Sequence, residues 1–325
     1  MGCPRAKPGP SKTQRRGVAL GLFVQTEDPV QRRRWYATFL DEIKDVGATD
    51  VSLVVRWSQA DVAASEVAPK QGVTVPDEVV VEVAALARER GLRVFLLPTL
   101  DVARRKTGQW RGIIRPLDPE AWWRSYGRFI GHYADIAKAA DASLFAVGSE
   151  LVSMERHADR WRALIADVRG RFSGRLTYSA NWDHFEPIGF WDALDVVGVT
   201  AYQGLSRKDD PSVKDLVDGW RPFHTRLRAW ARRLGHRYIF TEVGYPSRKG
   251  GAFRPWAYGD KGAPDVELQR RCYEALRNVW QDDKALAGLY LWNWFGRGGP
   301  DDSGYTPRGK PAEQVLRAWW RRRLR

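Results

Sequence analysis

Short apolar runs alternate with amphipathic stretches along nearly the whole chain. The apolar runs predict strands at 17–25, 50–57, 93–100, 143–151, 176–181, 195–203, 238–245 and 288–294. Between them, apolar residues recur at helical spacing. They predict helices at 30–46, 77–90, 119–140, 160–168, 212–234, 265–281 and 310–320, with an interruption or bend around Pro222. Strands that are apolar along most of their length are typical of a parallel sheet covered by helices.

The number of strand–helix units favours a closed barrel over an open sheet. Eight units match a (β/α)8 barrel, whereas an open doubly wound sheet more often has five or six strands. No glycine-rich dinucleotide-binding motif follows the first strand. A chain of 325 residues is within the range of a single α/β barrel. We therefore predict an α/β fold, a single-domain (β/α)8 TIM barrel over residues 17–325, preceded by a disordered basic leader at 1–16.

Polar and aromatic side chains close the predicted strands, and in such barrels the chemistry lies at the carboxyl ends of the strands. These strand-end residues are Arg56, Trp57, Thr99, Asp101, Glu150, Asn181, Trp182, Tyr202, Glu242, Trp292 and Trp294. A barrel brings Glu150 and Glu242 to one rim, although they are far apart in sequence. Two carboxylates of this kind are what glycoside hydrolysis requires, at ~5–5.5 Å for retention or ~6.5–9.5 Å for inversion.

The same residue types also occur for purely structural reasons. A lone strand-end glutamate often pairs with an arginine, but two glutamates in matching motifs favour catalysis. Arg56 is either a substrate contact or an ion-pair partner inside the barrel. Trp292 and Trp294 are two positions apart in one predicted strand, so their side chains point to the same side of the sheet. For one of the two, packing is as good an interpretation as contact with the sugar. Trp110 and Trp182 lie in loops, where a large aromatic residue favours contact with substrate.

The overall composition narrows the possible functions. The net charge is +14, and this favours a solvated arginine-rich surface, although polyanions are attracted as well. The five histidines form no H-E-x-x-H pair and lie near no cysteine, so we expect no metal and no cofactor. No apolar run is long enough for an integral membrane segment. We expect a monomer that binds a polysaccharide or oligosaccharide and no nucleic acid, since the basic 317–325 segment reads as the frayed end of a packed helix.

The amino-terminal residues bear on localisation. A Gly-Cys pair at Gly2 and Cys3, followed by a polar tether, resembles a bacterial lipoprotein after removal of its signal. We accordingly expect a secreted or periplasmic protein, with Cys3 as a candidate lipid anchor.

Four segments resemble glycoside hydrolase family 113, a family of retaining β-mannanases with (β/α)8 barrels. They are QWRGIIRPLDPEAWWRSYGRFIGHYA (109–134), FAVGSEL (145–151), the run at 176–205 and FTEVGYPSRKGGAFRPW (240–256). The resemblance implies Glu150 as general acid/base and Glu242 as nucleophile. It also implies Tyr202 as hydrogen-bond partner of the nucleophile and Trp292 as a platform beneath the sugar.

Two departures from the pattern concern the substrate more than the reaction. Ser149 precedes Glu150 where the related enzymes place an asparagine that contacts the sugar 2-hydroxyl, and Thr99 stands where a histidine is expected. The sequence predicts a retaining endo-β-glycosidase acting on β-1,4-mannan or a related β-linked polysaccharide. Two alternatives remain open: the same mechanism on another, acidic exopolysaccharide, and a non-catalytic polysaccharide-binding barrel.

Overall fold

Eight parallel strands close into a barrel in sequence order, and this confirms the predicted (β/α)8 architecture. The computed structural model describes residues 14–22 and 28–321. The strands are β1 (Arg15–Gly21), β2 (Asp50–Gln59), β3 (Arg93–Val102), β4 (Leu144–Ser149), β5 (Arg175–Asn181), β6 (Val197–Thr200), β7 (Tyr238–Val243) and β8 (Leu286–Leu291). The barrel closes where β8 pairs with β1.

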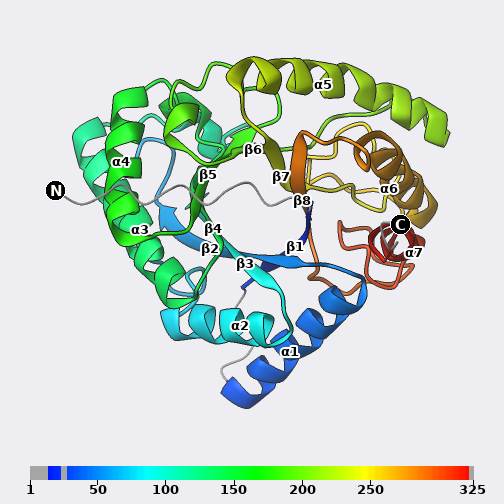
Figure 1. Cartoon of the computed structure of the whole chain (residues 1–325), viewed down its shortest axis with the longest axis horizontal. Coiled ribbons are helices and arrows are strands. Elements are labelled where there is room, and N and C mark those ends of the chain that lie inside the picture. Colours follow the sequence, from blue (N-terminus) through cyan, green and yellow to red (C-terminus); the bar gives the residue numbers. More distant parts are fainter. Residues whose placement is uncertain (1–13, 23–27, 322–325) are drawn as a thin grey trace.

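Helices surround the barrel on its outer side (Figure 1). They are α1 (Pro29–Asp45), α2 (Asp77–Glu89), α3 (Pro119–Ala139), α4 (Ala158–Arg171), α5 (Val213–Leu234), α6 (Val266–Trp280) and α7 (Pro311–Trp320), with short 3-10 turns η1 (Arg111–Ile113), η2 (Val152–Met154) and η3 (Trp191–Ala193). No helix in the described part of the chain combines the length and apolar character needed to cross a membrane.

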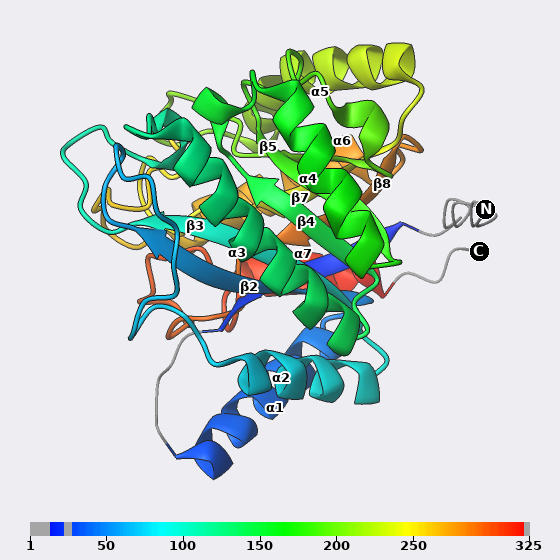
Figure 2. The ribbon, with the colours of Figure 1, turned by 90° about the vertical axis from the view of Figure 1, so that its left-hand side faces the viewer.

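Two apolar clusters hold the layers together. The larger one joins the outward side chains of the strands to the buried faces of the helices, and it includes Trp161, Trp220 and Trp280. The smaller one comes from nearly every strand and fills the barrel interior, with Phe95 and Tyr290 in contact at 4.9 Å between ring centroids. Packed side chains therefore fill the barrel. Its chemistry must lie at an end, where the loops after β2 and β3 project (left in Figure 2).

A buried ionic cluster closes the amino-terminal end of the barrel and corrects the predicted start of the domain. Strand β1 begins at Arg15, inside the stretch predicted as leader, because Arg15 donates to the fully buried Asp50 at 2.8 Å. Asp50 also accepts from Arg93 at 2.7 Å. The first thirteen residues, including Cys3, lie outside the described residues, as do residues 23–25 of the predicted first strand.

Two other elements differ from the prediction. Helix α5 continues through Pro222 without the interruption that was one of the two predicted possibilities, because Trp220 and Phe223 beside the proline are both buried in the core and packing outweighs the lost hydrogen bond. Strand β8 ends at Leu291 instead of Trp294. The peptide bond between Trp292 and Asn293, just after β8, is cis.

Candidate active site

Glu150 follows the last residue of β4 in an unusual backbone conformation. Its φ is +55°, in the left-handed region that side chains other than glycine rarely adopt. The pairing of β4 with β5 shifts register between Ala146 and Ser149 just before it. Hydrogen bonds fix the turn: Glu150 N–H donates to Ser179 O at 2.8 Å, and Leu151 N–H donates to Tyr178 Oη at 2.8 Å. The backbone is thus bent so that the carboxylate is held at the rim.

A buried polar group supports this turn from behind. Tyr178 Oη donates to Glu155 Oε1 at 2.7 Å, and His184 Nδ1 lies 2.7 Å from Glu155 Oε2. Glu155 is buried, and burial is the main reason why its pKa is raised. The cluster ties the segment after Glu150 to β5 and to the loop that follows β5.

Both oxygens of the Glu150 carboxylate have hydrogen-bond donors. Thr200 Oγ1, at the end of β6, donates to Oε1 at 2.8 Å, and Arg111 Nη2, in the loop after β3, donates to Oε2 at 2.6 Å. Glu150 is 8% exposed, so the carboxylate sits in a nearly closed site.

Glu242 enters the same site from β7. It is 4% exposed, and its Oε2 accepts a hydrogen bond from Tyr202 Oη at 2.9 Å. The strand register pairs Thr200 of β6 with Glu242 of β7, and the Thr200 hydroxyl donates to Glu150, so Thr200 lies between the two glutamates. Burial together with the nearby charge of Glu150 raises the pKa of Glu242 to about 7, against the opposing effects of Arg111, Tyr202 and Arg56.

The structure therefore brings the two glutamates within electrostatic reach of each other, as the barrel predicts. Two carboxylates that share a buried site do not both ionise readily, so the pair tends to hold one proton. In this arrangement the proton favours Glu242, because Glu150 accepts from two donors while Glu242 accepts from one.

Four other predicted substrate-binding residues lie around this pair. Burial, followed by the charge of Arg111, lowers the pKa of Arg56, and the charge of Glu242 opposes this, so Arg56 lies near both. Asn181 Oδ1 lies 3.4 Å from Thr200 Oγ1, and the ring of Trp292 packs on the interior cluster of the barrel. Ser149 is buried, and its Oγ has no hydrogen-bond partner within the described structure.

Two predicted contacts are corrected. Trp57 packs on α3, with ring centroids 5.4 Å from Phe129 and 6.2 Å from Tyr133, because its neighbour Arg56 points to the opposite face of β2. Trp294 is 1% exposed, and its Nε1 donates to Glu42 of α1 at 2.9 Å. Trp292 and Trp294 lie beyond the end of β8, where strand alternation no longer applies. Trp294 is a core residue, and Trp57 is partly buried against the core.

The two loop tryptophans lie at the rim. Trp110 precedes Arg111, and its ring packs so closely on Gly112 that a Cβ there would lie 2.3 Å from it. Trp182 stacks on Trp256 with centroids 5.6 Å apart. Trp256 is 43% exposed and belongs to the loop after β7, so this pair offers an aromatic surface beside the site.

Sequence reasoning left Thr200, Arg111 and Trp256 out of the predicted site. Thr200 lies two positions before Tyr202 in the same predicted strand, so strand alternation was a usable signal for it. Arg111 and Trp256 lie in long loops, where no spacing rule indicates which side chain turns back over the rim.

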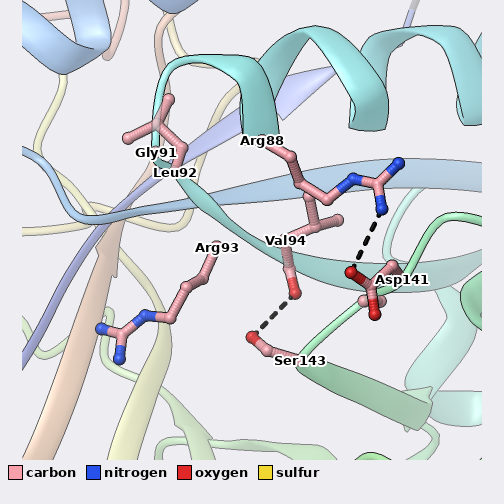
Figure 3. Close-up of a pocket in the computed structure, with 8 residues that line it drawn as sticks. Arg88, Gly91, Leu92, Arg93, Val94, Asp141 and Ser143 are labelled. Atoms are coloured by element: carbon pink, nitrogen blue, oxygen red, sulfur yellow. Dashed lines mark hydrogen bonds and ion pairs between the residues drawn. The ribbon is translucent and has the colours of Figure 1, made fainter.

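A separate depression of ≈ 360 Å³ lies at the amino-terminal ends of β3 and β4, whereas the glutamates lie at the carboxyl ends of their strands. Figure 3 shows the residues that line this depression. Three of its polar side chains have partners: Arg88 pairs with Asp141 at 3.1 Å, and Ser143 donates to the backbone carbonyl of Val94 at 3.1 Å. Residues 14–22 and 28–321 contain no group of three or more His, Cys, Asp or Glu arranged to hold a metal ion.

Comparison with known proteins agrees with the barrel fold. The model of Glycoside Hydrolase Family 113 matches residues 32–306. The β-mannanase AaManA from Alicyclobacillus acidocaldarius, solved in complex with ManMIm, is 30% identical with a TM-score of 0.83 over 94% of this chain and 97% of its own. Another family 113 β-1,4-mannanase is 26% identical with a TM-score of 0.83 over 94% and 98%. No curated protein matches the sequence.

The fold and the family match define a glycoside hydrolase. The chain belongs to glycoside hydrolase family 113.

Proposed function

We propose that this glycoside hydrolase is a retaining endo-β-1,4-mannanase in which Glu242 is the nucleophile and Glu150 the general acid/base. The observation that carries the proposal is the convergence of these two buried carboxylates from β4 and β7 in one site. The two mannanase structures at 26% and 30% identity support β-mannan as the polymer.

In the first step, one Glu242 oxygen forms a bond to the anomeric carbon while the bond from that carbon to the leaving oxygen breaks. Glu150 gives its proton to the leaving oxygen. In the second step, Glu150 takes a proton from water, the water oxygen bonds to the anomeric carbon, and the ester bond to Glu242 breaks. Tyr202 donates to Glu242 and supports its ionised form.

Azide rescue assigns the two roles separately. With a dinitrophenyl β-mannobioside, E242A should lose hydrolysis by several orders of magnitude and form an α-glycosyl azide when azide is added. E150A should form the β-glycosyl azide, because azide then replaces water in the second step. E186A, at an exposed position, is the matched control and should keep full activity.

Retained hydrolysis in E242A would eliminate Glu242 as the nucleophile. A β-azide from E242A, or an α-azide from E150A, would reverse the two assignments. Mannan hydrolysis that produces only monosaccharide would contradict endo action.

A further inference from the structure

The guanidinium of Arg111 is only partly satisfied in this site. Its Nη2 donates to Glu150 Oε2 at 2.6 Å, while its Nε is buried without a hydrogen-bond partner in the part of the chain that the structure describes. Nε and Nη2 lie on the same edge of the planar guanidinium. This edge is the fork that binds both oxygens of a carboxylate in parallel.

The contact between Arg111 and Glu150 conflicts with the acid step. A general acid must carry its proton on the oxygen that faces the leaving group. Glu150 Oε1 is turned toward Thr200, so Oε2 is the oxygen left for that task. Arg111 occupies Oε2, and a guanidinium only donates hydrogen bonds. Thr200 has no such conflict, because its hydroxyl lies 3.3 Å from Ala180 O and can donate there instead.

Arg111 therefore needs another acceptor when Glu150 is protonated. Its neighbour Arg56 is itself cationic, and the two charges disfavour each other. The charge of Glu242 still acts on Arg111 in that state, but no hydrogen bond joins the two residues within the described structure, so it leaves the donors of the fork without an acceptor. A neutral sugar hydroxyl replaces a carboxylate poorly at such a fork. A carboxylate on the substrate accepts one hydrogen bond from the unpartnered Nε and another from the Nη2 that Glu150 has released.

We propose that Arg111 binds, through its Nε–Nη2 edge, the carboxylate of a uronic acid unit on the leaving-group side of the cleaved bond. The polymer is then an acidic, β-linked, mannan-type polysaccharide. This inference rests on the proposed function and narrows its substrate. Binding of the acidic unit exchanges one ion pair for another and frees Glu150 Oε2 to hold the proton. The net charge of +14 favours the approach of such a polyanion.

The test compares matched substrates on matched variants. β-1,4-Manno-oligosaccharides are oxidised at the primary hydroxyls to carboxylates, and one portion is reduced back to the neutral form. Released reducing ends give kcat/KM for wild type, R111Q, R111K and R33Q. Arg33 is an exposed residue of α1 paired with Glu82, so R33Q removes one positive charge far from the site. R111K keeps the charge and loses the fork.

We expect wild type to cleave the oxidised form at least about tenfold better than the neutral form, as a charge-assisted bidentate contact implies. R111Q should lose this preference, R111K should keep only part of it, and R33Q should show the same preference as wild type. The proposal would be overturned if wild type had the same kcat/KM for the oxidised and the neutral form, or if R111Q lowered kcat/KM by the same factor for both.

Binding separates this proposal from the proposed function. The same oligosaccharides are titrated calorimetrically into E242A and into E242A/R111Q. If the acidic form binds more tightly only when Arg111 is present, but wild type cleaves neither form, the hydrolase proposal fails and the carboxylate site stands. If neutral mannan is cleaved and bound as well as the acidic form, the carboxylate site fails and the mannanase stands.

Discussion

The substitution E242Q should stabilise the protein at alkaline pH while abolishing activity. Burial and the charge of Glu150 raise the pKa of Glu242 from an ordinary 4.5 to about 7. At 1.36 kcal/mol per pH unit, this difference is worth about 3 kcal/mol of unfolding free energy. Glutamine has the shape of the protonated carboxyl and still accepts from Tyr202, so the variant should recover most of that amount.

The sign follows from proton binding. Between about pH 4.5 and 7 the folded protein keeps the Glu242 proton that the unfolded chain releases. The stability from this group is therefore fully present below pH 4.5 and is lost as the pH rises through 7. E242Q and wild type should match near pH 4 and diverge up to pH 8.

The assay is thermal unfolding followed by circular dichroism from pH 4 to 8.5. For a chain of 325 residues, about 3 kcal/mol corresponds to a Tm difference of about 4 °C at pH 8. E186Q, at an exposed position, is the control and should follow wild type throughout. An E242Q variant that is no more stable than wild type at pH 8, or a gap independent of pH, would refute this reasoning.

Three further predictions follow from single contacts. Y202F removes the donor to Glu242, so kcat should fall and the acidic limb of the pH–rate profile should move to higher pH. W256A should lower kcat/KM for a hexasaccharide relative to a disaccharide about tenfold, given ~1.5 kcal/mol for a stacked sugar, whereas W35A on exposed α1 should change neither. K310M removes the fully buried ammonium group that pairs with Asp302. Urea unfolding should therefore show a free energy of unfolding that is lower by about 3 kcal/mol.

The barrel was predictable because its signals are local and repeated. Each strand is an apolar run and each helix an amphipathic stretch, so eight repetitions determined the architecture and the side of the sheet that carries the chemistry. The same logic placed Glu150 and Glu242 at one rim. Their catalytic roles stay predictions until the variants are measured.

Contacts that depend on loop paths were not predictable. Arg111 reaches Glu150 from a long loop after β3, and Trp256 reaches Trp182 from the loop after β7. Trp294 was assigned to the rim by its position, yet its indole turns to Glu42 of α1. Strand periodicity gives the direction of a side chain only while the strand continues.

The central claim is that Glu242 becomes covalently bonded to the sugar. The most direct test incubates the protein with a 2-deoxy-2-fluoro-β-mannosyl fluoride and maps the modified peptide by mass spectrometry. We expect one fluorosugar on the peptide that contains Glu242, and none in E242Q. A label on Glu150, or full turnover of natural substrate with inversion at the anomeric carbon, would contradict it.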